Sequence, residues 1–166
     1  SHHQLTQMMQ DRLIKRHYIA LAKGRLISGA TIDAAIGRHP SKRTLMAVCA
    51  SGNPAITHYR VRQRFGHFTL LDVHLDTGRT HQIRVHFQSI RHSLVGDKTY
   101  GYRLALPPNC SPTLANQLRT VTHQALHAYC LSFVHPIVKD TVSVQAPIPQ
   151  WLDTLIACLA QYDPPI

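Results

Sequence analysis

The hydrophobic period of this chain changes once, and that change fixes most of what the chain can fold into. Residues 56–65 and 68–75 alternate apolar and polar side chains with a period of two, which predicts two successive strands with one buried face each. Soon afterwards Ile83, Phe87 and Ile90 recur at helical spacing and form one apolar stripe. Strands in hairpin succession followed by a packed helix predict a mixed domain built on an antiparallel sheet.

The remaining segments extend this pattern. Further strands are predicted, in chain order, over residues 15–22, 31–36, 42–50, 124–135 and 141–146. A helix is predicted near each end of the chain, with apolar residues at helical spacing: Leu5, Met8, Met9 and Leu13 within and just after residues 4–12, and Leu152, Leu155, Ile156 and Leu159 in the last helix. We therefore expect an α+β fold, a single domain over residues 1–166 in which a largely antiparallel mixed sheet is flanked by helices.

The net charge points to a polyanionic partner. Lys and Arg total 18 against 8 acidic residues, so the formal charge is +10 with neutral histidines, above the magnitude of about 2–8 that suits a small domain with no steering role. All eight acidic residues are Asp. The absence of Glu excludes the His-Glu-x-x-His zinc peptidases, the EF-hands and the zinc nucleobase deaminases, which all need a Glu. Nucleic acid is the expected partner, ahead of an anionic membrane surface.

Cysteine usage and hydropathy bear on location. Cys49, Cys110, Cys130 and Cys158 form no Cys-x-x-Cys pair, which is typical of reduced intracellular thiols rather than of a disulfide framework. No stretch approaches the ~18 apolar residues of a membrane span. We expect a cytoplasmic protein that makes no membrane contact.

No metal site is expected from the histidines. His123 and His127 have the i, i+4 spacing of a helical zinc pair, but the segment around His127 is predicted to be a strand, where this spacing separates the two rings. Spacing indicates no third ligand. A histidine-based metallohydrolase stays an alternative that a folded protein without stoichiometric metal would exclude.

One predicted strand carries a row of cations. Its period of two places His58, Arg60, Arg62 and Arg64 on the same face. Basic side chains gathered along one face are typical of surfaces that bind nucleic-acid phosphates. We therefore expect this row to contact a nucleic-acid backbone.

The start of the helix after Gly78 is also basic. With Thr80 as a plausible N-cap, Arg79, His81 and Arg84 surround the first turn, where the helix dipole disfavours cations. Cations at this end indicate that an anion is held between them, either a carboxylate from elsewhere in the protein or a nucleic-acid phosphate. The alternative is that the side chains extend into solvent at a cost of a few tenths of a kcal/mol.

Tyr18 lies among cations in a predicted strand, next to Lys15, Arg16 and His17. An aromatic ring between basic groups suits a surface that stacks a base and holds its phosphate. Taken alone, a half-buried strand tyrosine is the simpler interpretation. The loop over residues 95–101 can be a structural turn, or it can approach a ligand.

Several motifs together resemble the RluA family of pseudouridine synthases. The principal one is LDTGRTHQIRVH at residues 75–86, followed by HSLVGD at 92–97 and YG at 100–101. Further matches, which single out one branch of the family, are RHPSKRT at 38–44, MAV at 46–48, PA at 54–55, THYR at 57–60, QALHA at 124–128 and APIPQ at 146–150. The resemblance extends from the first residues to the last helix, so it is more specific than any single motif.

The resemblance implies an isomerase that converts uridine to pseudouridine in RNA, here large-subunit ribosomal RNA. In this family the uracil is detached from its ribose, turned and rejoined through carbon, with no cofactor and no metal. The resemblance also implies a rRNA-processing role in ribosome biogenesis. We expect RNA as the partner and a monomeric protein.

The resemblance also implies roles for particular residues. Tyr18 matches the active-site tyrosine that stacks on the target base, and Arg84 matches the arginine that pairs with the catalytic aspartate. Because a base inside a duplex must be flipped out to react, other basic side chains are expected to hold the displaced backbone. The expected RNA-binding residues are Arg60, Arg62, Arg64, Arg79 and His81.

One family motif is missing from the sequence. The catalytic aspartate of the family lies in a His-Arg-Leu-Asp motif upstream of the tyrosine, and no such tetrapeptide occurs here. Asp11 precedes Tyr18, but it is followed by Arg12 and Leu13, which is the wrong order. We therefore expect the chain to be the C-terminal part of a catalytic domain, inactive alone, whose partner for Arg84 is not among its eight aspartates. The alternative is a non-catalytic RNA-binding module.

Overall fold

The computed structural model describes residues 6–8 and 13–165. Residues 6–8 are helical; the predicted helix over 4–12 otherwise lies outside the described residues, as do Leu5, Met9 and Asp11. The strands are β1 (Lys15–Lys23), β2 (Ala30–Asp33), β3 (Ile36–Arg38), β4 (Met46–Val48), β5 (Ile56–Arg64), β6 (Phe68–Leu75), β7 (Leu126–Val134) and β8 (Thr141–Gln145). The helices are α2 (Gln82–Ser89), the 3-10 turn η1 (Lys98–Tyr100), α3 (Pro112–Thr120) and α4 (Gln150–Tyr162).

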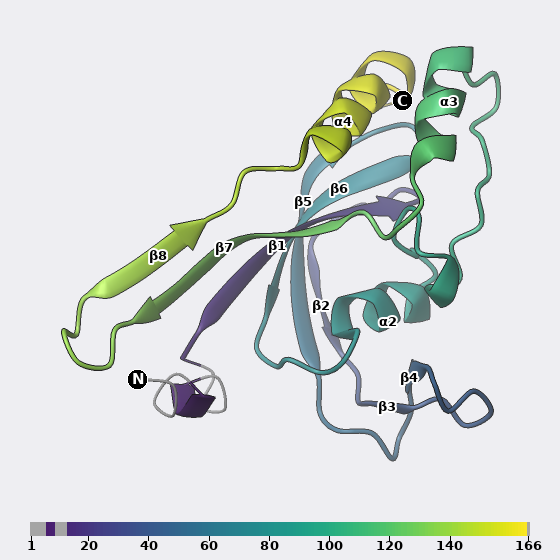
Figure 1. The fold of residues 1–166 in the computed structure, drawn as a ribbon. Coiled ribbons are helices and arrows are strands. Elements are labelled where there is room, and N and C mark those ends of the chain that lie inside the picture. Colours follow the sequence, from purple (N-terminus) through teal and green to yellow (C-terminus); the bar gives the residue numbers. More distant parts are fainter. Residues whose placement is uncertain (1–5, 9–12, 166) are drawn as a thin grey trace.

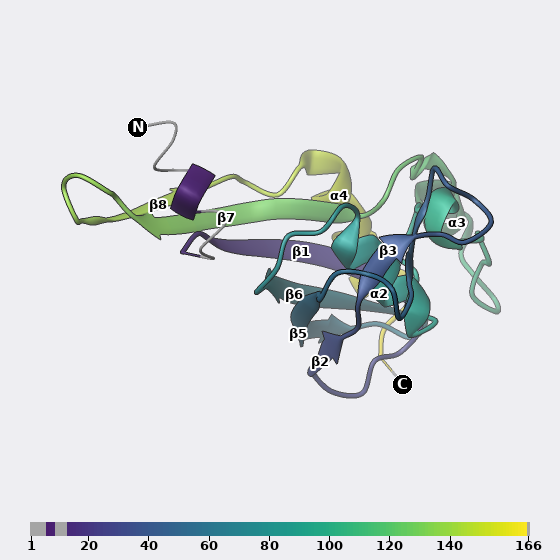
Figure 2. The same cartoon turned by 90° about the horizontal axis from the view of Figure 1, so that it is seen from below.

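Six strands form one sheet in the order β2-β5-β6-β1-β7-β8, and each neighbouring pair is antiparallel. The sheet is seen along its strand order in Figure 2, and the β7–β8 hairpin projects beyond the helices in Figure 1. Strands β3 and β4 form a separate two-stranded ribbon. The expected antiparallel sheet flanked by helices is confirmed.

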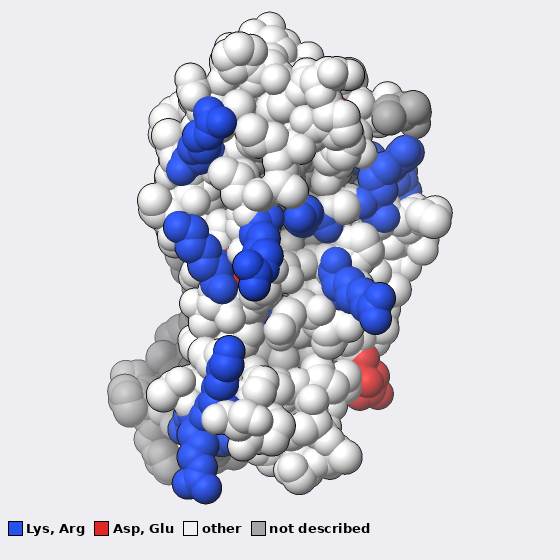
Figure 3. Space-filling view, turned by 90° about the vertical axis from the view of Figure 1, so that its right-hand side faces the viewer, with Lys and Arg blue, Asp and Glu red and all other residues white. Residues whose placement is uncertain are grey.

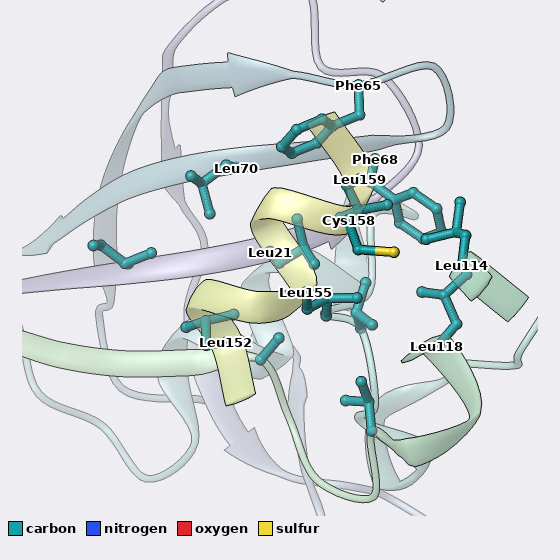
Figure 4. Close-up of a cluster of buried hydrophobic side chains, with 14 of the residues drawn as sticks. Leu21, Phe65, Phe68, Leu70, Leu114, Leu118, Leu152, Leu155, Cys158 and Leu159 are labelled. Atoms are coloured by element: carbon teal, nitrogen blue, oxygen red, sulfur yellow. The ribbon is translucent and has the colours of Figure 1, made fainter. Parts of the chain in front are cut away.

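The two faces of the sheet bury different helices. On one face, Ile19 and Leu21 of β1 pack with Leu70 of β6 against apolar side chains of α3 and α4; Figure 4 shows Leu21 and Leu70 in this cluster. On the other face, Ala20 and Ala22 of β1 pack against α2. Because side chains alternate along a strand, β1 contributes to both cores, which is why residues 19–22 are all buried.

Two predicted elements differ from those observed. Residues 31–36 divide between β2 and β3, which belong to different sheets, and of residues 42–50 only β4 is a strand. Helix α3 was not predicted. Ser111 caps it by accepting a hydrogen bond from the N–H of Leu114, and Pro112 occupies the first turn, where a missing N–H costs nothing. None of the described helices is long and apolar enough to cross a membrane.

Candidate active site

A cleft of about 350 Å³ opens on the α2 face of the sheet, where β1 begins and β6 ends. Its walls come from β1, from the β6–α2 connection, from the first turns of α2 and from the start of β7. The lining residues include Arg16, Tyr18, Gly78, Arg79, His81, Arg84 and Gln124. The structure thus brings Tyr18, Arg79, His81 and Arg84, which the sequence singled out, together in one cleft.

Tyr18 lies where β1 is held from both sides. It pairs with Val73 of β6 and with Ala128 of β7, and the register with β7 shifts between His17 and Tyr18. Tyr18 is two residues before Ala20 on β1, so its side chain lies on the same face of the sheet, the one that packs against α2. The ring is half-buried against that core and lines the cleft.

Arg84 is bound to a carboxylate of this chain. Its Nε donates to Oδ2 of Asp97 at 2.7 Å, and its Nη2 donates to Oδ1 at 2.8 Å. The Asp97 side chain is 1% exposed, and it caps η1 by accepting the N–H of Tyr100, the last residue of that turn. The hydrogen bonds to Asp97 raise the pKa of Arg84 above its usual value, against the effect of burial. The expectation that none of the eight aspartates supplies the partner of Arg84 is therefore wrong.

The aromatic ring of Tyr100 packs against the guanidinium of this ion pair. The guanidinium of Arg84 lies 4.7 Å from the centre of the Tyr100 ring. The Tyr100 hydroxyl accepts the N–H of Met46 at 3.2 Å and lies 2.7 Å from Nδ1 of His81. Burial, followed by the nearby charge of Arg84, lowers the pKa of His81. Arg84 is thus fixed in place by Asp97 and Tyr100, which lie together in the segment of residues 97–100.

Helix α2 begins one residue later than predicted. Its N-cap is His81, in a left-handed conformation (φ 58°) and without a side-chain capping bond, so Thr80 does not cap the helix. The entry is fixed by Gln82 instead. Oε1 of Gln82 accepts from Thr77 and from the N–H of Arg79, and its Nε2 donates to the carbonyl of Ile56. This buried amide joins the β6–α2 loop, which carries Arg79, to β5, and no sequence motif indicated this role.

The predicted row of cations on β5 is divided by a β-bulge. The pairing with β6 shifts between Val61 and Gln63, so that Arg60 faces Asp72 while Arg64 faces Thr69. Positions 72 and 69 are an odd number apart on β6, and the two arginines therefore lie on opposite faces of the sheet. The prediction of one cationic face is wrong for this reason.

The three β5 arginines have different surroundings. Arg60 lines a second cleft, on the α4 side of the sheet. Arg62 makes an exposed ion pair with Asp72 at 3.3 Å. Arg64 donates to the carbonyls of Leu26 and Ile27. None of the three lines the cleft of Tyr18, whereas Arg79 and His81 do.

The histidines of the described residues form no group of three or more ligands that could hold a metal ion. The two histidines at zinc-like spacing have different surroundings. His123 packs edge-on against Trp151, and His127 is on β7. His86 is fully buried between Thr57 and the carbonyl of Ala34, and burial lowers its pKa.

The surface on the side of α2 and α3 carries several separate Lys and Arg side chains and very little acidic surface (Figure 3). The buried Asp97 neutralises Arg84, whereas Arg16 and Arg79, which also line the cleft, have no ion-pair partner among residues 6–8 and 13–165. Such a cleft can hold an anionic ligand beside an aromatic ring.

Comparison with known proteins places these features in one family. Residues 1–89 match the family described as RNA pseudouridylate synthase. The chain is 47% identical over 152 residues to ribosomal large subunit pseudouridine synthase D of Escherichia coli (strain K12), covering 92% of this chain and 47% of that protein. It is 45% identical over 157 residues to the protein of the same name from Xylella fastidiosa, covering 95% and 47%. The chain therefore spans about half the length of the curated relatives it matches.

Solved structures agree with this. The human RNA pseudouridylate synthase domain containing 1 superimposes with a TM-score of 0.72 at 27% identity, over 96% of this chain and 63% of that one. A second human protein, RNA pseudouridylate synthase domain containing 4, superimposes with a TM-score of 0.73 at 20% identity, over 99% of this chain and 69% of that one, which shows a shared fold. The family and the branch that the sequence motifs indicated are both confirmed by these similarities.

Proposed function

The chain belongs to the RNA pseudouridylate synthase family, and from this premise we propose that it supplies the base-binding side of an active site that isomerises uridine to pseudouridine in large-subunit ribosomal RNA. The observation that carries the proposal is the cleft in which Tyr18 and Arg84, placed far apart in the sequence, lie together with Arg79 and His81. An aromatic ring beside cationic groups suits a flipped base and its phosphates.

We assign a separate task to each residue. Tyr18 stacks on the uracil, since its ring lines the cleft from a rigid strand. Asp97 occupies Nε and Nη2 of Arg84, and Nη1 donates to a carboxylate at the reacting centre, where the fixed guanidinium keeps that carboxylate ionised. Arg79 and His81 contact the backbone of the displaced nucleotide. Arg60, Arg62 and Arg64 contact RNA outside this cleft, which none of them lines: Arg60 lines the cleft on the α4 side, and the bulge places Arg64 on the opposite face from Arg60.

Asp97 does not replace the family's catalytic aspartate. Both of its carboxylate oxygens are engaged, by Arg84 and by the N–H of Tyr100, and almost none of its side chain reaches the cleft. The sequence contains no His-Arg-Leu-Asp motif. We therefore propose that the 166-residue chain binds RNA but forms no pseudouridine on its own.

A chimera tests the proposal directly. The half of the Escherichia coli relative that this chain matches is replaced by residues 13–165, and pseudouridine is measured in ribosomal RNA by chemical labelling and primer extension. We expect an active chimera, and an inactive one when Tyr18→Ala or Arg84→Ala is introduced. A folded chimera that binds RNA but forms no pseudouridine would contradict the proposal.

The second candidate is a non-catalytic RNA-binding module, favoured by the missing motif and by the net charge of +10. Arg84→Ala in the chimera distinguishes the two. An active-site role predicts a far larger loss of turnover than of RNA affinity, whereas a binding role predicts equal losses.

We also propose that the protein acts as a monomer in the cytoplasm, in the processing of rRNA during ribosome biogenesis. All four cysteines are free thiols in the structure, which suits a reducing compartment. A disulfide in protein isolated under non-reducing conditions, or a dimer in analytical ultracentrifugation, would contradict this assignment.

A further inference from the structure

Arg16 differs from the other two arginines of the candidate cleft. Arg84 is bound by Asp97, and Nε of Arg79 donates to the carbonyl of Pro54 at 3.1 Å. Arg16 has no hydrogen-bond or ion-pair partner among residues 6–8 and 13–165, and its Nε is buried without one. A buried donor with no acceptor carries a desolvation cost, so this guanidinium is held ready for an anion that it does not find within the described part of the chain.

Gly78 makes room for this guanidinium. A Cβ at position 78 would lie 2.7 Å from Nη1 and 2.8 Å from Nη2 of Arg16, closer than such atoms approach. The backbone φ of Gly78 is not positive, so conformational freedom is not the reason for a glycine there. The absence of a side chain at Gly78 therefore permits the close approach of the Arg16 guanidinium to this loop.

Arg16 stands where two clefts meet. It lines the cleft of Tyr18 and also a cleft of about 730 Å³ on the α4 side of the sheet. The second cleft contains the basic or titratable side chains Lys15, His17, Arg60 and His74 together with the ring of Tyr129. Its two carboxylates are already paired, Asp72 with Arg62 and Asp76 with His58. The positive groups of the second cleft thus continue the charge of Arg16 around the end of the sheet.

We propose that Arg16 binds a phosphodiester of the RNA at this junction, so that the strand whose base contacts Tyr18 continues past the end of β1 toward Lys15 and Arg60. The proposal rests on the proposed function, because it takes RNA as the ligand of the first cleft. A guanidinium suits this task, since its fork of donors can hold two phosphate oxygens at once.

The experiment measures binding of a uridine-rich single-stranded RNA oligonucleotide to the 166-residue chain by fluorescence anisotropy. The variants are Arg16→Gln, Arg16→Lys and Gly78→Ala, with Arg119→Gln as the matched control. Arg119 is on α3, and within the described part of the chain its side chain bonds only to Asn116, one turn earlier. Thermal unfolding of each variant verifies that it is folded.

We expect Arg16→Gln to weaken binding roughly tenfold, as for a lost charge-assisted hydrogen bond, and to reduce the log–log salt slope by about 0.7, the value for one single-strand phosphate. Arg16→Lys should recover part of the affinity, and Arg119→Gln should bind as the parent does. Gly78→Ala should weaken binding without removing a charge, and it should have little further effect in the Arg16→Gln background. Additive losses would overturn the role of Gly78.

A second measurement observes Arg16 directly in the unmodified protein, so that it does not depend on any variant folding. RNA should shift the Nε–H resonance of Arg16 in the NMR spectrum, and inorganic phosphate at the same phosphate concentration should not. An equal shift with inorganic phosphate would show a free-anion site and overturn the assignment to RNA. RNA binding that is unchanged in Arg16→Gln overturns the inference and leaves the proposed function intact, whereas no RNA binding by the parent chain overturns both.

Discussion

Arg84 of α2 holds Asp97 through two hydrogen bonds of 2.7 and 2.8 Å, and Asp97 in turn caps η1 by accepting the N–H of Tyr100. This ion pair joins α2, which ends at Ser89, to the loop that contains Asp97. Because the Arg84 side chain is only 13% exposed and that of Asp97 1% exposed, water compensates little of either charge. The pair therefore fixes the position of the Arg84 guanidinium, which lines the cleft.

Removing the carboxylate should destabilise the fold strongly. Asp97→Asn leaves the Arg84 guanidinium buried without its counter-charge, and we expect a loss of about 3–5 kcal/mol in the free energy of unfolding. Urea unfolding measures it. Asp72→Asn is the matched control, since Asp72 pairs with Arg62 at an exposed position and should cost at most about 1 kcal/mol. Equal losses in the two variants would show that the Arg84–Asp97 pair does not act as a buried ion pair.

Removing the hydroxyl group should have different effects on protein stability at two neighbouring tyrosines, Tyr100 and Tyr102. The Tyr100 hydroxyl bonds to Met46 and His81, so Tyr100→Phe should destabilise the protein by about 1 kcal/mol. The Tyr102 hydroxyl is buried with no partner among the described residues, and burial raises its pKa to about 12. Tyr102→Phe should therefore leave stability unchanged or raise it by up to about 1 kcal/mol. Thermal unfolding of both variants tests the two predictions. A clear loss of stability in Tyr102→Phe would reveal a hydrogen-bond partner for this hydroxyl.

His86 should make the protein less stable in mild acid. Burial lowers its pKa from 6.5 in the folded state, so the folded chain keeps the ring neutral at pH values where the unfolded chain binds a proton. The stabilisation is fully present above pH 6.5 and is lost as the pH falls from 6.5 toward the lowered pKa, by up to ~1.4 kcal/mol per pH unit. Urea unfolding between pH 8 and pH 5 measures this slope.

The control for His86 is a variant that cannot titrate. His86→Gln should lower stability at pH 8 and show a shallower loss between pH 6.5 and pH 5 than the parent. An identical slope in the two proteins would assign the acid sensitivity to other groups. The contacts of His58 with Asp76 and of His67 with Asp163 are present in both proteins and cancel in the comparison.

The sequence predicted the sheet because strand signals are local. Alternation over residues 56–65 and 68–75 predicts one buried face for each strand, and the observed strands β5 and β6 have nearly these bounds. The prediction of a single buried face is wrong for β6, because residues 68–71 are buried on both faces of the sheet. The same reasoning failed for the cations of β5, since one inserted residue in the pairing reverses every later side chain, and nothing in the alternation of Arg60, Arg62 and Arg64 marks the bulge.

The candidate site was predictable in part. Motif similarity indicated Tyr18 and Arg84, and the helix start indicated that Arg84 needs an anion. The identity of that anion depends on how the loop of residues 95–101 folds back on α2, which is a tertiary contact without a sequence period. Arg16 was noted only as a neighbour of Tyr18, because a guanidinium without a partner can be recognised only when its surroundings are known.

The proposed stacking role of Tyr18 depends on its aromatic ring and not on its hydroxyl group. Its ring lines the cleft, and stacking on a base needs only the aromatic face, so Tyr18→Phe should bind a uridine-rich oligonucleotide as the parent does. Tyr18→Ala should weaken binding by about 1–3 kcal/mol, the usual cost of losing one stacked base. Fluorescence anisotropy at fixed salt measures both, with Tyr162→Ala as control because Tyr162 is 39% exposed on α4. If Tyr18→Phe loses as much affinity as Tyr18→Ala, then the hydroxyl rather than the ring carries the contact, and the stacking assignment is wrong.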